Sequence, residues 1–347
     1  MSALFRDDID IPHITLLEGL QHSLTTKIER PERLTAAAYG ALTPPKRKRY
    51  DEDRAKYVTG GIRVKTPLGE ETLMLYRQIR RGNLYAPNRT GLIIDGAGHM
   101  GKTTLCQYLM QWTYDKYMEE HPYGVRDGDV PVVYIEARPR SSGRALLTAF
   151  AEFFGLVIPT AYKTDHILTT VVQVMQKKRT QLVVIDEFQN IAARNPGNGE
   201  TVDYIKELTN AVKATFVISG IHVLSSDILA GVRGNQLASR FIQQELRPYS
   251  IANDELKLRW SQLLINYERE LLLLAQKPKS ILAHANELHE ATHGSIGALA
   301  KLLTRTTVDL IFDADADMEH FDASSFSSQR RDITSESVIY EGGNIAA

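Results

Sequence analysis

Short runs of hydrophobic residues in the middle of the chain predict buried strands. The clearest run extends from Leu182 to Ile185 and contains only Leu, Val and Ile. Runs of this kind, without alternating polar residues, are typical of parallel strands that are covered on both faces. We predict strands at residues 92–95, 131–136, 182–186, 215–219 and 241–246.

Between these strands the hydrophobic residues recur at helical spacing, which predicts amphipathic helices. The helices are expected at residues 103–117, 143–154, 165–177 and 200–212. Strands that alternate with helices predict a parallel sheet with helices on both faces. The sequence therefore predicts an α/β domain at residues 86–250.

The pattern changes after this domain. Apolar residues recur at helical spacing around Trp260, and two further helical patterns, at 281–293 and 296–312, lie on either side of Gly294. These patterns predict a small helical domain at residues 251–312.

The two ends of the chain have less regular patterns. Residues 1–85 are of mixed polarity, and we expect an N-terminal extension that Pro44 and Pro45 interrupt. A helix is predicted within it at 70–81. Residues 313–347 are acidic and then rich in Ser, so we expect a flexible C-terminal tail.

Composition limits the classes of function. The chain has 347 residues, of which 43% are hydrophobic, and its net charge is −1. Nucleic-acid binding would therefore need a local basic patch, because the whole chain has no positive excess. The single cysteine, Cys106, excludes an internal disulfide and is expected to be a packing residue. We see neither a signal peptide nor a membrane-spanning segment, and we expect a cytoplasmic protein.

Residues 96–103 carry the strongest chemical signal. They are Gly96, Ala97, Gly98, His99, Met100, Gly101, Lys102 and Thr103, and they fit the phosphate-binding pattern G-x-x-x-x-G-K-[ST]. A predicted strand precedes them and a predicted helix follows, which is the context that the pattern requires. The glycines let backbone N–H groups face phosphate oxygens, and Lys102 would reach the β- and γ-phosphates. We expect this loop and Thr104 to bind ATP, with the Thr103 hydroxyl on Mg²⁺.

Two acids follow the apolar run at 182–185. Asp186 and Glu187 end a predicted parallel strand, and the carboxyl ends of such strands face the crevice where ligands bind. Asp186 is a candidate for holding Mg²⁺, directly or through water. Glu187 is a candidate for the general base that activates the attacking water.

Other polar residues are candidates for catalysis. Ser219 ends another predicted strand, where a small polar residue can sense the γ-phosphate, and His222 is the second candidate for this role. Arg240 precedes the last strand, and an arginine from a neighbouring subunit can neutralise charge on the γ-phosphoryl group. Arg233 is the alternative. An ordinary turn and ordinary surface arginines would explain the same residues.

Taken together, these motifs resemble those of AAA+ ATPases of the TniB/TnsC type, which regulate bacterial transposons. The resemblance covers residues 34–310. Besides the phosphate loop and the acidic strand end, it depends on four segments. These are a lead-in with Arg49, Tyr50, Arg54 and Tyr57, the strand 132–135 with its basic loop 138–142, the segment 237–241, and the segment 294–299.

The resemblance implies ATP-dependent assembly of many copies into a ring or a helical filament on double-stranded DNA. It also implies contact with a transposase and a target-selector protein, and ATP hydrolysis that remodels the assembly. One departure concerns the helical domain, because related lids often carry an arginine sensor that this chain lacks near Gly297 and Ala298. Either Arg305 substitutes for it or this domain does not sense the γ-phosphate.

A basic loop is the candidate DNA-binding surface. Arg138, Arg140 and Arg144 follow a strand of the α/β domain, and one such loop from each subunit could line the inside of an oligomer. The residues Lys46–Arg49 form another basic patch. Ordinary solvated charge would explain either patch.

Two other functions remain open. His289, Glu290 and His293 fit the zinc-peptidase pattern H-E-x-x-H, which places both histidines on one face of a helix. An ATPase that loads a helicase, or that signals in a defence system, would have the same nucleotide-binding motifs and would use ATP as an assembly switch.

Overall fold

The computed structural model describes residues 12–86, 88–191, 198–223, 225–226, 229–322 and 324–326. These residues form two compact units. The first consists of the described residues up to Thr26, together with Glu71–Ala97 and Lys102–Leu246. The second consists of Lys27–Glu70, Gly98–Gly101 and the described residues from Arg247 onward.

A parallel sheet forms the centre of the first unit. Its strands are β1 (Gly91–Gly96), β2 (Val132–Glu136), β3 (Leu182–Asp186), β4 (Thr215–Gly220) and β5 (Phe241–Leu246). Their order is β2-β3-β4-β1-β5, and every neighbouring pair is parallel. The expected α/β fold is confirmed, and β3 and β5 have the predicted bounds.

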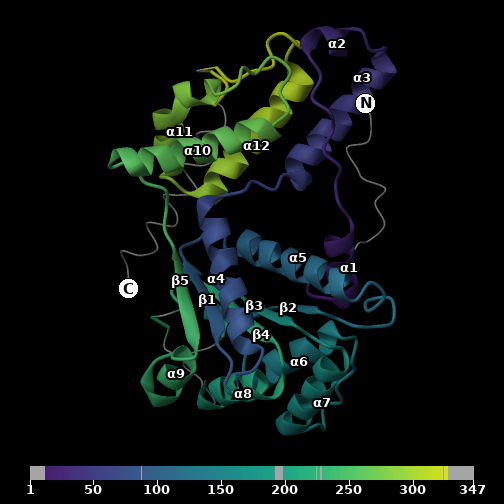
Figure 1. Ribbon diagram of the computed structural model, residues 1–347, viewed down its shortest axis with the longest axis vertical. Helices are drawn as coiled ribbons and strands as arrows, with labels where there is room; N and C mark the ends of the chain where they lie inside the picture. Colours follow the sequence, from purple (N-terminus) through teal and green to yellow (C-terminus); the bar gives the residue numbers. More distant parts are fainter. Residues whose placement is uncertain are drawn as a thin grey trace. The chain divides into compact units, whose positions relative to one another are not determined.

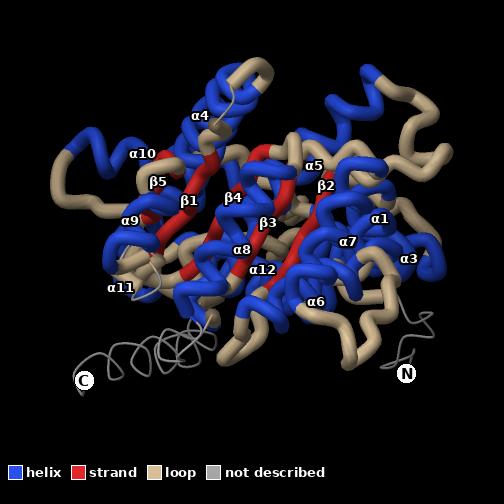
Figure 2. The backbone as a smooth tube through the Cα atoms, turned by 90° about the horizontal axis from the view of Figure 1, so that it is seen from below, coloured by secondary structure: helices blue, strands red, loops and turns tan. Residues whose placement is uncertain are grey.

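The direction of the chain through the sheet decides where the helices lie. The chain moves from β1 outward to β2 and then returns through β3 and β4 to β5. Right-handed crossovers then require the first connecting helix and the later ones to cover opposite faces. Figures 1 and 2 show α5 on one side of the sheet and α6, α7 and α8 on the other. These connecting helices are α5 (Lys102–Glu120), α6 (Gly143–Phe153), α7 (Thr164–Lys177), α8 (Asn198–Ala211) and α9 (Gly231–Ala238).

Of the helices that precede β1 in the described residues, α1 and α4 contribute to the first unit. α1 (Leu17–Thr25) packs against α5, where the Gln111 side chain donates to the Leu24 carbonyl over 3.1 Å. α4 (Pro67–Asn83) begins in the second unit and continues into the first, because the division falls at Glu70. Tyr76 of α4 is buried, and its hydroxyl lies 2.8 Å from that of Thr113 on α5.

The second unit is helical, as expected, but it includes more of the chain than expected. Apolar side chains of α10, α11 and α12, with Trp260 at the centre, form its core. Its elements are α2 (Ala36–Gly40), α3 (Pro44–Lys56), η1 (Tyr57–Gly61), α10 (Asp254–Glu270), η3 (Ser280–His284), α11 (Ala285–Thr292) and α12 (Ile296–Asp313). Val58 of η1 belongs to the same core.

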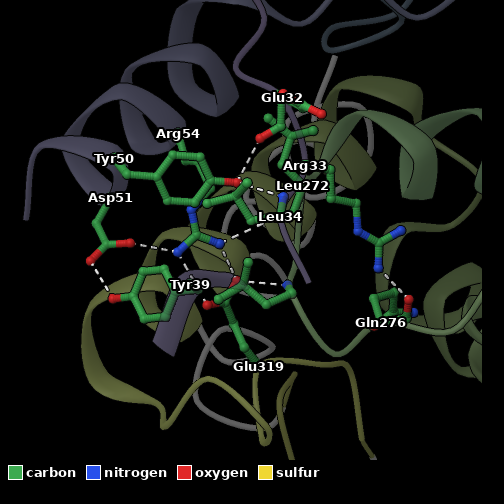
Figure 3. Close-up of polar contacts among 11 residues, drawn as sticks. Glu32, Arg33, Leu34, Tyr39, Tyr50, Asp51, Arg54, Leu272, Gln276 and Glu319 are labelled. Carbon is green, nitrogen blue, oxygen red and sulfur yellow. Dashed lines mark hydrogen bonds and ion pairs between the residues drawn. The ribbon is translucent and has the colours of Figure 1, made fainter. Parts of the chain in front are cut away.

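A buried ion-pair cluster connects the early and late parts of this unit (Figure 3). Arg54 on α3 is fully buried, donates to Asp51 over 2.7 Å, and also donates to Glu319. The Tyr39 hydroxyl donates to the other Asp51 oxygen over 2.7 Å, and the Tyr50 ring lies 4.9 Å from the Arg54 guanidinium carbon. Burial, and then the hydrogen bond to Asp51, raise the pKa of Tyr39 to about 12.

The structure differs from three predictions about the ends of the chain. The region 1–85 is not one extension, since residues 27–70 belong to the helical unit and residues 71–85 to the unit with the sheet. Pro44 and Pro45, which were expected to interrupt this region, instead open α3, because a first-turn proline lacks only an N–H that would be unpaired anyway.

The expected tail also begins later than residue 313. Phe321 and Phe326 are buried in the helical core, and Glu319 is buried against Arg54. The two aromatic side chains bury apolar area in this core, and the backbone N–H of Phe321 donates to the Gln276 side chain over 2.8 Å. The rest of the expected tail, 327–347, lies outside the described residues.

Among the described residues, no helix combines the length and the apolar character that crossing a membrane requires.

Candidate functional site

The phosphate loop connects β1 to α5, as the motif requires. Lys102 is the first residue of α5 and is only 7% exposed. Its ammonium group donates to the carbonyls of Gly96 and Ala97 over 2.8 and 2.7 Å. Burial lowers the pKa of Lys102, and the two carbonyl contacts hold the ammonium group inside the loop.

Two glycines of the loop are required by geometry. Gly101 has a φ of +80°, which residues other than glycine rarely adopt. Gly96 has ordinary dihedrals, but a Cβ there would lie 2.8 Å from the carbonyl oxygen of Leu246. The loop therefore starts at a close approach between β1 and β5.

The acidic end of β3 contacts the start of α5 directly. Asp186 is 1% exposed, and one of its oxygens accepts from the Thr103 hydroxyl over 2.9 Å and from the Tyr134 hydroxyl over 3.1 Å. The other oxygen accepts from the backbone N–H of Glu187 over 2.9 Å. The two residues predicted to hold Mg²⁺ thus meet, and a hydroxyl beside a carboxylate is an oxygen donor set that suits this ion.

Sequence reasoning missed the role of Tyr134. Burial, and then the charge of Asp186, raise the pKa of this phenol, so it remains protonated and donates. The available signal was a lone tyrosine in an apolar strand, paired in register with Val184, two residues before Asp186. It donates to the same Asp186 oxygen as Thr103 and so helps to orient the carboxylate.

Glu187 begins a sharp turn. Its φ of 54° and ψ of 38° are left-handed, and it is followed by the 3₁₀ turn η2 (Phe188–Asn190). Its carboxylate accepts from the side-chain amide of Gln189 over 2.5 Å. The predicted general base is therefore held by a neighbour that the sequence analysis did not single out.

The two sensor candidates differ in exposure. Ser219 on β4 is fully buried, and its side chain interacts with the Cys106 thiol of α5. It pairs in register with Ile94 of β1, the strand that leads into the phosphate loop. His222 is exposed beyond the end of the strand, with a φ of 52°.

Both finger candidates contact α8. Arg240 lies between α9 and β5, and its guanidinium donates to the Asn210 side chain over 2.6 Å. Arg233 on α9 forms an ion pair with Asp203 over 2.9 Å. The two arginines are therefore held beside the same helix of this unit.

The three arginines of the basic loop are in different environments. Arg138 forms an ion pair with Glu152 of α6 over 2.7 Å. Arg144 donates to the carbonyls of Tyr162 and Thr160 over 2.5 and 3.2 Å. Arg140, at the exposed turn with a φ of 59°, forms no ion pair with any described residue.

Four residues of the phosphate loop, Gly98–Gly101, belong to the helical unit, and within this unit they lie against the start of α12. The carbonyl of His99 accepts from the backbone N–H of Gly297 over 2.8 Å and from the Ser295 hydroxyl over 3.0 Å. Ser295 also caps the N-terminus of α12. The chain thus has no arginine near Gly297, but the backbone of Gly297 itself contacts the loop residue His99.

The zinc-peptidase hypothesis is wrong. α11 ends at Thr292, and His293 has a φ of 48°, so the two histidines do not share a helical face. The Nε2 atom of His289 lies 2.9 Å from the carbonyl oxygen of Tyr249. The described ranges contain no group of three or more His, Cys, Asp or Glu side chains that could hold a metal.

Comparisons with known proteins agree with this architecture. The family model described as "Bacterial TniB protein" matches residues 81–251. No curated protein matches the chain.

Solved structures share the fold at low identity. The Aeropyrum pernix ORC1 protein, solved in complex with DNA, is 16% identical with a TM-score of 0.57, over 80% of this chain and 67% of that one. The A. pernix ORC2 protein, solved as ADPNP–ADP complexes, is also 16% identical with a TM-score of 0.54, over 81% and 71%.

Proposed function

The chain is an AAA+ ATPase of the TniB type, and from this premise we propose that it assembles on double-stranded DNA with ATP and recruits or activates a transposase. Hydrolysis then remodels the assembly. The contact between Thr103, which follows Lys102, and Asp186, which precedes Glu187, is the observation that carries the ATP-dependent part of the proposal.

The residues of this chain have distinct roles in the proposal. The phosphate loop and Thr104 bind the triphosphate, and Thr103 and Asp186 would hold Mg²⁺, which would supply positive charge to the phosphates. Glu187 accepts a proton from the attacking water. Ser219 senses the γ-phosphate, and Arg240 enters the site of a neighbouring copy, where such a finger is worth roughly 10³–10⁵ in rate.

Support for DNA as the partner is less direct than support for ATP binding. The ORC1 structure contains DNA, although its likeness to this chain shows the fold alone. A net charge of −1 makes a single copy a weak DNA binder, whereas many copies would add one contact each from the loop at Arg140. We therefore propose that ATP-driven assembly and DNA binding occur together.

Electron microscopy of the protein with duplex DNA, under Mg²⁺–ATP, ADP and no nucleotide, tests this function. Of these three conditions, we expect rings or filaments on DNA only with Mg²⁺–ATP. Identical particles in all three conditions would contradict an ATP-driven assembly. Oligomers that form equally with and without DNA would favour the signalling ATPase. Adding a transposase should give a ternary complex only on the ATP-bound assembly.

A further inference from the structure

Gln189 lies in the turn η2 that follows β3, two residues after Glu187, and its side chain has two partners in the first unit. Its Nε2 atom donates to the Glu187 carboxylate over 2.5 Å. Its Oε1 atom accepts the backbone N–H of Ile221 over 2.9 Å. Only one orientation of the amide satisfies both partners. A flipped amide would place its oxygen against the Glu187 carboxylate and its NH₂ group against the backbone N–H of Ile221.

The second partner belongs to the main chain just past β4. Ile221 follows Ser219 and Gly220 directly. A Cβ on Gly220 would lie 2.5 Å from the Gln189 Oε1 atom, so a glycine is needed for this close approach. The amide of Gln189 therefore bridges the ends of two neighbouring strands.

A second amide fixes the same turn on its other side. Asn190 donates from its side chain to the Ala137 carbonyl beyond β2 over 3.0 Å. Its backbone N–H donates to the Glu187 carbonyl over 2.8 Å, but its side chain forms no hydrogen bond with the Glu187 carboxylate among the described residues, and it serves as an internal comparison. The turn is thus attached to β2 through Asn190 and to β4 through Gln189.

Glu187 needs such support. Its left-handed backbone is uncommon for residues other than glycine, and its carboxylate sits on a side chain with several rotatable bonds. The hydrogen bond from Gln189 engages one carboxylate oxygen and restricts the rotation of the other.

We propose that Gln189 is a positioning residue for Glu187, and that it couples the orientation of this carboxylate to the main chain that follows Ser219. The inference rests on the proposed role of Glu187 as general base. A shift of Gly220 and Ile221 passes to the carboxylate through one side chain, so the end of β4 influences hydrolysis without touching the water.

Gln189→Glu tests the inference most sharply. The variant keeps the shape of the side chain and the acceptor for Ile221, but it places a second carboxylate against Glu187. We expect kcat to fall roughly 10- to 100-fold at neutral pH with KM for ATP changed less than about 2-fold. Two adjacent carboxylates share a proton, so the acid limb of the kcat–pH profile should move to higher pH.

Asn190→Asp is the matched control, because it makes the same chemical change one residue away. It should keep the wild-type pH profile. Gln189→Met, similar in length but apolar, should lower kcat without moving the profile, and it replaces Gln189→Glu if that variant does not fold.

Glu187→Gln, measured alongside, separates the two proposals. If this variant hydrolyses ATP at the wild-type rate, the general-base role itself fails. If it is slow while Gln189→Glu and Gln189→Met keep wild-type kcat and pH dependence, the positioning role is overturned. Equal losses in Gln189→Glu and Asn190→Asp with unchanged pH profiles would also overturn it, since they would indicate a merely structural turn.

Discussion

Lys102 shows how much of the site depends on single atoms. Its ammonium group contacts the carbonyls of Gly96 and Ala97 from the inside of the loop. A charged donor of this kind contributes more to binding an anion than a neutral one does.

We expect Lys102→Ala to weaken Mg²⁺–ATP binding roughly 100-fold, since hydrogen bonds to charged groups contribute about 1.5–3 kcal/mol each. Isothermal titration calorimetry measures the change. Lys116→Ala, which removes an exposed lysine from the same helix, should bind normally. Unchanged affinity in Lys102→Ala would remove this lysine from the nucleotide site.

Arg54 is the residue whose burial is least expected from its sequence. It lies in a run of charged residues, yet it is 0% exposed between Asp51 and Glu319. Its removal would leave two carboxylates uncompensated in the core. Removal of one carboxylate leaves the arginine with the other. The two changes should therefore differ in cost.

We expect Arg54→Met to lower the free energy of unfolding by about 3–5 kcal/mol, and Glu319→Gln by about 1–3 kcal/mol. Urea unfolding followed by circular dichroism measures both. Equal losses would show that the cluster is not arranged around a single buried cation.

The stability lost in Arg54→Met should depend on pH. Burial raises the pKa of Glu319 above its unfolded value, so protonation favours the folded state, and this contribution is lost as pH rises through the folded pKa. Without Arg54 this effect grows. The deficit of Arg54→Met should therefore be smaller near the unfolded carboxyl pKa of about 4.3 than at neutral pH.

At the scale of elements, the N-terminus of α12 contacts His99, a loop residue that belongs to the same helical unit. The N-cap residue Ser295 and the first-turn residue Gly297 both donate to the carbonyl of His99. A Cβ on Gly297 would lie 2.5 Å from that oxygen, so the contact depends on a glycine. We infer that this helix influences the loop through its backbone.

Gly297→Ala should weaken ATP binding about 10-fold, because overpacking of this size costs roughly 1–3 kcal/mol and displaces either the loop or the helix. Binding of a fluorescent ATP analogue measures the effect. Gly82→Ala is the control, since a Cβ there meets nothing within 4 Å. Equal affinity in both variants would separate α12 from nucleotide binding.

At the scale of the whole molecule, DNA binding depends on which basic residues an assembly exposes. Arg138 and Arg144 are engaged by their own chain, whereas Arg140 stands at an exposed turn. We therefore choose Arg140 as the first of the three candidates to test.

Arg140→Glu should weaken DNA binding by the ATP-bound assembly and reduce its salt dependence, because each lost phosphate contact lowers the number of counterions released. Fluorescence anisotropy at several salt concentrations measures both, with ATP affinity as the control. Arg126→Glu, at another exposed arginine, should bind DNA normally. Equal DNA affinity at the same salt would move the DNA surface elsewhere.

The sequence by itself determined the strands, four of the five connecting helices described above, and the phosphate loop; α9 was not predicted. Each is encoded by consecutive residues, through the period of apolar positions or the conformational freedom of glycine. Asp186 and Thr103 could be paired in advance, because the carboxyl ends of parallel strands meet at one edge.

Only the tertiary structure decided which distant side chains meet. Arg54 and Glu319 lie 265 positions apart, and Ser295 and His99 lie 196 apart. The link from Gln189 to Ile221 and the end of α11 before His293 were equally hidden. Periodicity shows which side of an element is buried, but a partner is chosen by the packing of the whole chain, and the sequence carries no local signal for it.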